Sequence, residues 1–297
     1  MTARRRTAGG IALASVAALL ASAAPTRAAD APSPAPAGAR DAGPQPDLEA
    51  VLARVAPAVV TVQFLLRYEG GFETTDWAHG VVVDPSGLVL LASGNVGGGD
   101  AKLADVKVLL GADPKEWPAV LVARDSTLDL AYVQVLGDEG RPFAHVDLDA
   151  AAARKPEPRL GEPLCGVTRT GRAFDYAPSV RRLYFTTRIE APRRMWDFAG
   201  EFGEAGLPVF DATGQPVAVL SRQSGTEGAD EGGGSSTDTF ALPLSTVVKS
   251  LEQARKRVPE AVRKAAEARK DGEARGDAEP AKPAPDAAPG GEKPGGR

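Results

Sequence analysis

Cysteine and histidine are scarce in this chain of 297 residues, which holds one Cys and two His. The single thiol of Cys165 cannot form an internal disulfide, and one thiol cannot build a thiolate zinc site. His79 and His145 are too few for a histidine-rich metal centre. We therefore expect neither a metal nor a cofactor.

Positive charge is also in short supply. The chain has 35 Lys and Arg against 39 Asp and Glu, so its formal net charge is −4 at pH 7. A protein that binds nucleic acid needs clustered Lys and Arg to neutralise the phosphates. The acidic balance therefore predicts no nucleic-acid partner.

The two ends of the chain do not have the composition of a folded domain. Residues 1–28 begin with three Arg, continue through the apolar run IALASVAALLASAA and end in small residues, as secretory signal peptides do. We expect export to the periplasm or the extracellular medium, with membrane contact only through an uncleaved signal segment. Residues 29–46 are rich in Pro and Ala and predict a disordered linker. Residues 258–297 predict a charged helix and, from about Asp271, a disordered tail rich in Ala, Pro and Gly.

Residues 47–257 predict one all-β domain. Asp47 is expected to cap a short helix, and Ser245 a second helix that Pro259 interrupts and restarts. Two sets of short apolar segments separated by turn residues lie between them, and no long helical period interrupts either set. Two such runs of antiparallel strands predict two β-barrels. The expected strands are 58–68, 80–84, 88–92, 105–111, 118–125 and 128–136, followed by 162–170, 180–191, 207–211, 216–222 and 239–244.

The stretch GEAGLPVF at 203–210 is a Gly-x-x-Gly turn that feeds an apolar strand. A tight bend of this kind can aim consecutive backbone N–H groups at one point, which is how an oxyanion hole is made. The stretch resembles the GNSGGPL turn of trypsin-like serine proteases of the HtrA/Deg family. Similar motifs follow that family's order over most of residues 48–255: LLASGNV, DSTLDLAYV, LGEPLCGV and TFALPL. The resemblance implies a trypsin-like double β-barrel.

The same resemblance removes the catalytic machinery. It places Gly94 where the family has its catalytic His, Asp129 at the third member of the triad and Ala205 where the nucleophilic Ser belongs. A Ser hydroxyl needs an imidazole to take its proton and a carboxylate to hold that imidazole. Only the carboxylate remains, so the resemblance implies a pseudoprotease. Asp129 also has a simpler interpretation as a turn carboxylate that accepts backbone N–H bonds.

Several residues near these positions are candidates for contact with a polypeptide. In the related proteases the substrate adds as a strand beside the second barrel, so residues 193–202 and the strand edge at 220–224 are expected partners. Ser93 could be considered as a substitute nucleophile, but no base is placed to activate it. The candidates for the oxyanion turn are Gly203 and Glu204, and those for peptide binding are His79, Trp196, Phe202 and Gly206. His79 also has the simpler interpretation of a surface or half-buried residue, and Trp196 that of a core residue.

Three functions therefore stand open at the level of sequence. The first is a secreted, inactive serine-protease-like protein that binds an unfolded polypeptide or an envelope protein partner. The second is an active HtrA/Deg-type endopeptidase with an unrecognised catalytic arrangement. The third is a structural envelope protein.

Overall fold

The computed structural model describes residues 45–97, 101–111, 113, 115–137, 140, 142–224 and 237–276. The predicted signal peptide, nearly all of the predicted linker, the chain after residue 276 and the acidic loop at 225–236 lie outside the described residues.

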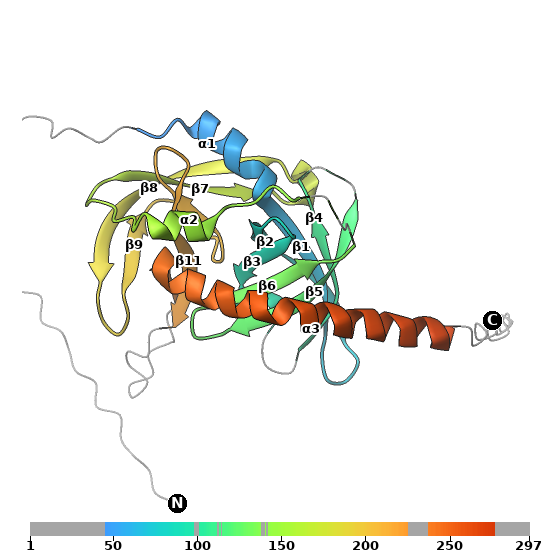
Figure 1. Ribbon diagram of the computed structural model, residues 1–297. Coiled ribbons are helices and arrows are strands. Elements are labelled where there is room, and N and C mark those ends of the chain that lie inside the picture. Colours follow the sequence, from blue (N-terminus) through green and yellow to red (C-terminus); the bar gives the residue numbers. More distant parts are fainter. Residues whose placement is uncertain are drawn as a thin grey trace, which may run out of the picture. The chain divides into compact units, whose positions relative to one another are not determined.

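Two closed antiparallel barrels of six strands each form the body of the protein (Figure 1). The strand order is β1-β2-β3-β6-β5-β4 in the first barrel and β10-β11-β12-β9-β8-β7 in the second. This architecture confirms the predicted all-β fold with two barrels. The strands of the first barrel are β1 (Val59–Arg67), β2 (Glu73–Asp84), β3 (Leu88–Ala92), β4 (Lys102–Leu109), β5 (Glu116–Asp125) and β6 (Leu130–Val135). Those of the second are β7 (Pro163–Arg169), β8 (Pro178–Ile189), β9 (Met195–Ala199), β10 (Pro208–Phe210), β11 (Pro216–Ser224) and β12 (Thr237–Pro243).

Two strands differ from the prediction. Strand β2 begins at Glu73, not at residue 80, because its polar and exposed first half hides the apolar signal while still pairing with β1. Strand β9 was not predicted, since it has only five residues, yet Asp197 pairs with Thr187 of β8. The segment around 195–199 is therefore an integral strand of the second barrel.

Short helices and 3-10 turns connect the strands. Helix α1 (Leu48–Val55) is capped as predicted by Asp47, whose Oδ1 accepts a bond from the Ala50 amide at 3.1 Å. Helix α2 (Leu148–Ala153) was not predicted, and Asp147 caps it in the same way. The 3-10 turns are η1 (Ala56–Ala58), η2 (Ser93–Val96) and η3 (Arg172–Phe174).

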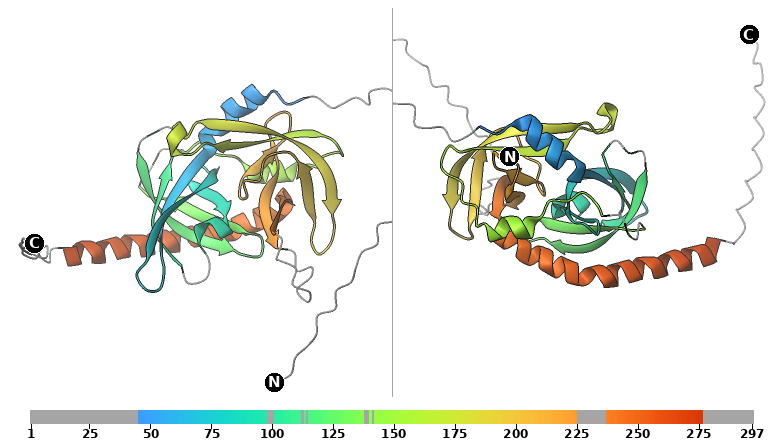
Figure 2. Two further views of the ribbon diagram at one scale, coloured as in Figure 1. Left: turned by 180° about the vertical axis from the view of Figure 1, so that it is seen from behind. Right: turned by 45° about the horizontal axis from the view of Figure 1, so that its top comes forward.

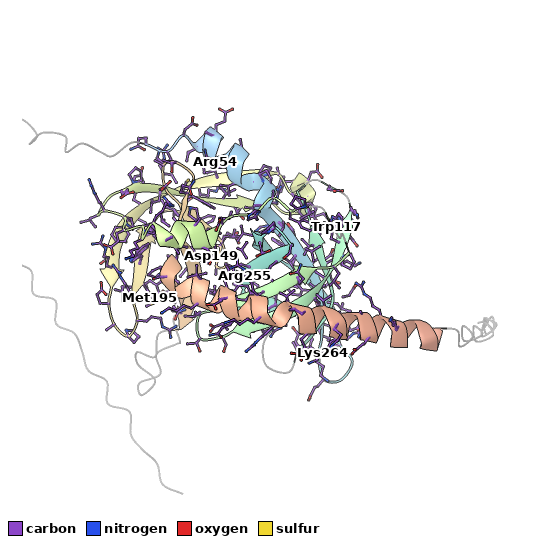
Figure 3. The ribbon with its side chains drawn as sticks, viewed as in Figure 1. Arg54, Trp117, Asp149, Met195, Arg255 and Lys264 are labelled. Carbon is purple, nitrogen blue, oxygen red and sulfur yellow. The ribbon has the colours of Figure 1, made fainter. Side chains whose placement is uncertain are left out.

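Helix α3 (Leu244–Gly276) is continuous, so the predicted interruption at Pro259 is wrong, and the helix extends past the predicted start of the tail. A proline inside a helix costs about 3 kcal/mol through its lost N–H bond and its ring clash. The part of the helix before Pro259 is anchored to the body of the protein by buried Leu251 and Ala254 and by ion pairs of Arg255. Arg255 lies 2.6 Å from Asp149 of α2 and 3.1 Å from Asp84 of β2, and Figure 3 labels Arg255 beside Asp149. Within the described residues no helix combines the length and the apolar character needed to cross a bilayer.

The two barrels share apolar packing. One buried cluster fills the interior of the first barrel, including Val62, Phe64 and Val133. A second cluster joins the interior of the second barrel to Val59 and Leu90 on the outer side of the first. This shared core holds the end of β3 against the turn that precedes β10. The views in Figure 2 show the two barrels side by side, with α3 running along β5.

Candidate functional site

Gly94 lies in η2, directly after β3, and Asp129 lies directly before β6; the two residues are in contact. The Gly94 amide donates to Asp129 Oδ1 at 2.7 Å, and the Ser93 amide donates to the Asp129 carbonyl at 3.1 Å. Asp129 has a left-handed backbone with φ of 49°, and it is only 7% exposed. Its carboxylate therefore organises the η2 turn, as the simpler sequence interpretation expected.

Arg222 of β11 supplies the cation that this buried carboxylate needs. Both its amide, at 3.1 Å, and its Nε, at 3.2 Å, donate to Asp129 Oδ2, while Nη2 donates to Asn95 Oδ1 at 2.5 Å. A Cβ atom added to Gly94 would lie 3.1 Å from Arg222 Nη2. The guanidinium thus occupies the space in front of Gly94, where the resemblance would place an imidazole.

Reasoning from sequence missed Arg222. The available signal was indirect: a buried Asp without a histidine partner requires another cation or donor. A guanidinium remains protonated in proteins and offers no acceptor, so Arg222 cannot take a proton from a hydroxyl. Ser93, the neighbour of Gly94, therefore has no base in this ion pair.

The turn that carries Ala205 packs directly on the end of β3. Gly206 has φ of 88°, and a Cβ added to it would lie 2.2 Å from the Ala92 amide nitrogen. The Gly206 amide also donates to the Leu220 carbonyl of β11 at 2.8 Å. The buried Ala205 methyl consequently lies beside the end of β3 from which η2 and Gly94 follow.

The same turn is closed to an oxyanion. The Ala205 amide donates to the Gly203 carbonyl at 3.0 Å, and the Leu207 amide donates to the Glu204 carbonyl at 3.2 Å. The backbone N–H of Ala205 is therefore already bonded within the turn, so it does not point at an open site together with its neighbours.

Glu204 ties the turn to the first barrel through His79 of β2. Its Oε2 lies 3.5 Å from His79 Nδ1, which also lies 3.0 Å from Thr168 Oγ1 of β7. Bonding to His79 lowers the pKa of the half-buried Glu204 carboxyl, although burial opposes that shift. His79 is 4% exposed, so its ring links elements of the fold and has no surface to present to a peptide.

The other peptide-binding candidates also lie inside the fold. Trp196 is 1% exposed and packs edge-on against Phe185, with ring centroids 6.2 Å apart. The buried Phe202 ring fills the space over Gly166, where a Cβ would lie 2.2 Å from the ring. Gly206 is covered by β3 as described above. These side chains face inward because the barrel interiors need large apolar groups.

The expected path for a peptide strand is occupied as well. The amide and carbonyl of Leu220 are bonded to Leu207 and Gly206, and the Arg222 amide is bonded to Asp129. The segment at 195–199 pairs with β8. The edge predicted at 220–224 is therefore filled as far as Arg222.

The remaining rare side chains add no reactive group. Cys165 is buried, and burial raises the pKa of its thiol to about 11. His145 is exposed between β6 and α2, with Nδ1 3.1 Å from the Phe143 carbonyl oxygen. Within the described residues no group of three or more His, Cys, Asp or Glu side chains could hold a metal ion.

The chain matches no protein-family model, and it has no match among curated proteins.

Proposed function

We propose that this protein is a catalytically inactive, trypsin-like serine-protease homologue of the HtrA/Deg type that acts by binding a polypeptide or an envelope protein. The observation that carries the proposal is the Arg222 guanidinium in front of Gly94, bonded to Asp129. In a working triad that space and that carboxylate belong to the imidazole.

Three further features support inactivity. The nucleophile position holds a methyl group, at Ala205. Its backbone N–H is bonded to Gly203, and the cation beside Asp129 cannot act as a base. Serine proteases that lose a triad member keep only a residual rate enhancement of about 10³–10⁴ over the reaction in water. That residual activity depends on an intact oxyanion hole. An active endopeptidase would need all of these groups rearranged.

The proposal also includes where the protein acts in the cell, namely outside the cytoplasm. The signal-like residues 1–28 support export to the periplasm or beyond, where a double barrel without a nucleophile can bind unfolded envelope proteins without cleaving them.

One experiment tests both halves of the proposal. Fluorescently labelled, unfolded casein is added to purified protein lacking residues 1–28, and anisotropy reports binding while gel electrophoresis reports cleavage. A fluorophosphonate probe is applied in parallel. We expect binding, no cleavage and no labelling.

The opposite outcomes separate the alternatives. Cleavage that survives repurification and is lost on one substitution in this chain would establish an active endopeptidase. Absence of binding at high micromolar casein, with no labelling, would favour a structural envelope protein.

A further inference from the structure

The first barrel has an incomplete ladder between two of its strands. Strands β4 and β5 pair only from Lys107↔Pro118 to Leu109↔Glu116. On its other side β4 pairs with β1 back to Lys102, and β5 pairs with β6 on to Asp125. One edge of each strand, at 102–106 and at 119–124, therefore has no strand partner among the described residues. We call these two edges the β4–β5 seam.

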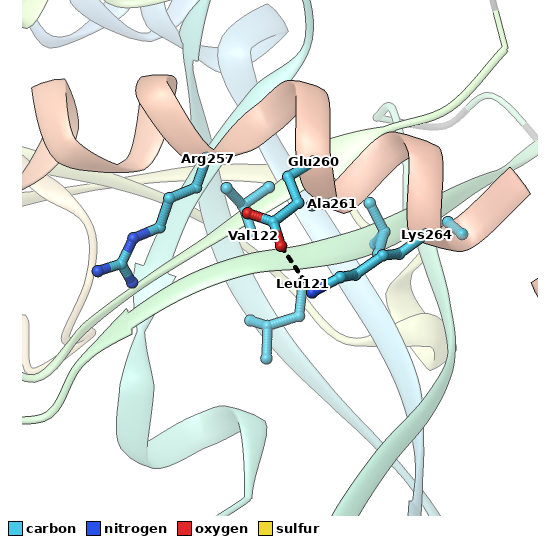
Figure 4. Close-up of a pocket in the computed structure, with 8 residues that line it drawn as sticks. Leu121, Val122, Arg257, Glu260, Ala261 and Lys264 are labelled. Atoms are coloured by element: carbon cyan, nitrogen blue, oxygen red, sulfur yellow. Dashed lines mark ion pairs between the residues drawn. The ribbon is translucent and has the colours of Figure 1, made fainter. Parts of the chain in front are cut away.

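A groove runs along the seam beneath the distal half of α3. Its volume is about 610 Å³, and Ala265, Ala268 and Arg269 of α3 lie on one side of it. A second groove of about 560 Å³ lies between β5 and α3 and shares Val120, Leu121 and Ala265 with the first. Figure 4 shows α3 crossing β5 at this second groove. Both volumes fall in the range of ligand-binding clefts, about 300–1,000 Å³. We call the two together the seam groove.

The seam groove is lined by apolar side chains together with charged ones, and the apolar side chains are incompletely covered. Leu103 of β4 and Ala119 through Val122 of β5 are all half-exposed. The residues of α3 above them, Ala261 and Ala265, have side chains too short to cover this surface. Unpaired strand edges beside apolar walls are the features to which an extended peptide adds as a further strand.

The charge around the seam groove is positive, although the whole chain is acidic. Between Leu244 and Lys270 the sequence of α3 holds eight Lys and Arg against three Glu. At the groove, the acids Asp105 and Glu260 are already paired with Lys107 and Lys264. Four lining cations have no ion-pair partner among the described residues: Lys102, Arg124, Arg257 and Arg269. Arg124 already donates to the backbone carbonyls of Val96 and Gly97, which leaves the other three for a ligand.

We propose that the seam groove binds an extended, acidic polypeptide segment of another molecule. The segment would add as a strand to the seam, and its carboxylates would pair with Lys102, Arg257 and Arg269. The chain's own termini fit this position poorly, because residues 30–44 hold four prolines and residues 277–297 hold five. Proline lacks the N–H that strand addition uses. This site rests on the binding half of the proposed function and is independent of the Arg222–Asp129 site.

The test uses three synthetic peptides of ten residues with a fluorescent label. The first alternates Val and Glu, the second alternates Val and Lys, and the third is the Val–Glu peptide with one central Glu replaced by Pro. Titration of the full mature protein is followed by anisotropy. We expect the Val–Glu peptide to bind, and both other peptides to bind at least about tenfold more weakly.

Matched variants on α3 locate the site. Ala265→Phe fills the groove and should abolish binding, whereas Ala266→Phe, on the exposed side of the same turn, should not. Arg257→Glu combined with Arg269→Glu should weaken binding roughly tenfold, while Arg263→Glu, which does not line the groove, serves as the charge control. Thermal unfolding verifies that every variant is folded.

Each remaining outcome overturns the seam proposal. Equal binding by the Ala265→Phe and Ala266→Phe variants would place the peptide elsewhere. No binding by the wild type at 1 mM peptide would remove the site, while binding of unfolded casein would still uphold the proposed function. Self-association that is lost on Ala265→Phe and competes with the peptide would make a second copy the occupant. Tighter peptide binding after deletion of residues 225–236 would make that acidic loop the occupant.

Discussion

Arg222 Nε lies 3.2 Å from Asp129 Oδ2, and these two residues are 93 positions apart in the chain. The pair joins β11 of the second barrel to the residue that precedes β6 in the first barrel. Because Asp129 is buried and Arg222 is half-exposed, the pair is more than a surface contact.

The first prediction concerns removal of this cation. Arg222→Ala leaves the Asp129 carboxylate buried with fewer donors, so we expect a loss of about 1–3 kcal/mol in the free energy of unfolding, measured with urea. Arg181→Ala, an exposed arginine of β8, should change it by less than about 0.5 kcal/mol. Equal midpoints for the two variants would show that the ion pair contributes nothing.

The second prediction concerns the missing nucleophile. Ala205→Ser should not take up a fluorophosphonate, because the Asp129 carboxylate is bonded to Arg222 and not to an imidazole, and the N–H of residue 205 is bonded to Gly203. In-gel fluorescence checks this against an active trypsin control. Labelling of this single variant would mean that another residue of the chain serves as the base.

The third prediction concerns the space in front of Gly94. Gly94→His should destabilise the fold, because its Cβ would lie 3.1 Å from Arg222 Nη2 and the ring would compete with the guanidinium. Adding Arg222→Ser removes that competition and lets the imidazole donate to Asp129, so the double variant should be less destabilised in thermal unfolding than the sum of the two single variants. Additive destabilisation in the double variant would contradict the shared space.

The fourth prediction concerns the turn against β3. Gly206→Ala should cost more than about 4 kcal/mol, since the added Cβ meets backbone at 2.2 Å and the residue has a positive φ. Gly203→Ala is the matched control, because nothing lies within 4 Å of its added Cβ, and it should be nearly neutral. Urea denaturation of both variants gives the comparison.

The fifth prediction concerns pH. Bonding to His79 lowers the pKa of the Glu204 carboxyl below its ordinary value of 4.5. A lowered pKa contributes stability above the unfolded-state pKa, and that stability is lost as pH falls through the folded-state value. Glu204→Gln should therefore be less stable than wild type at pH 6, by up to about 1 kcal/mol, because the carboxyl is half-exposed. The difference should shrink below pH 4.5, and a difference that stays constant from pH 6 to pH 3 would refute this assignment.

The strand pattern was readable from sequence wherever a strand is long and mostly apolar, as β1, β3 and β6 are. The two barrels follow from those strands and their turns. Strand β9 was not predicted because five residues carry too little periodic signal. The first half of β2 was not predicted because it is polar and exposed. The continuity of the helix through Pro259 was not predicted, since the residues that Arg255 contacts, Asp84 and Asp149, lie far from it in the chain.

At the candidate site, sequence alone determined which reactive groups positions 94 and 205 can carry. A methyl at position 205 and a hydrogen at position 94 cannot attack a carbonyl or accept a proton, and this follows from residue identity in any fold. Only the tertiary structure decided which side chains surround these positions. Arg222 reaches Asp129 because two barrels pack together, and Trp196 and Phe202 turn inward because the second barrel must fill its interior. Ion pairing and burial depend on distances between residues far apart in the chain, and residue order by itself does not contain those distances.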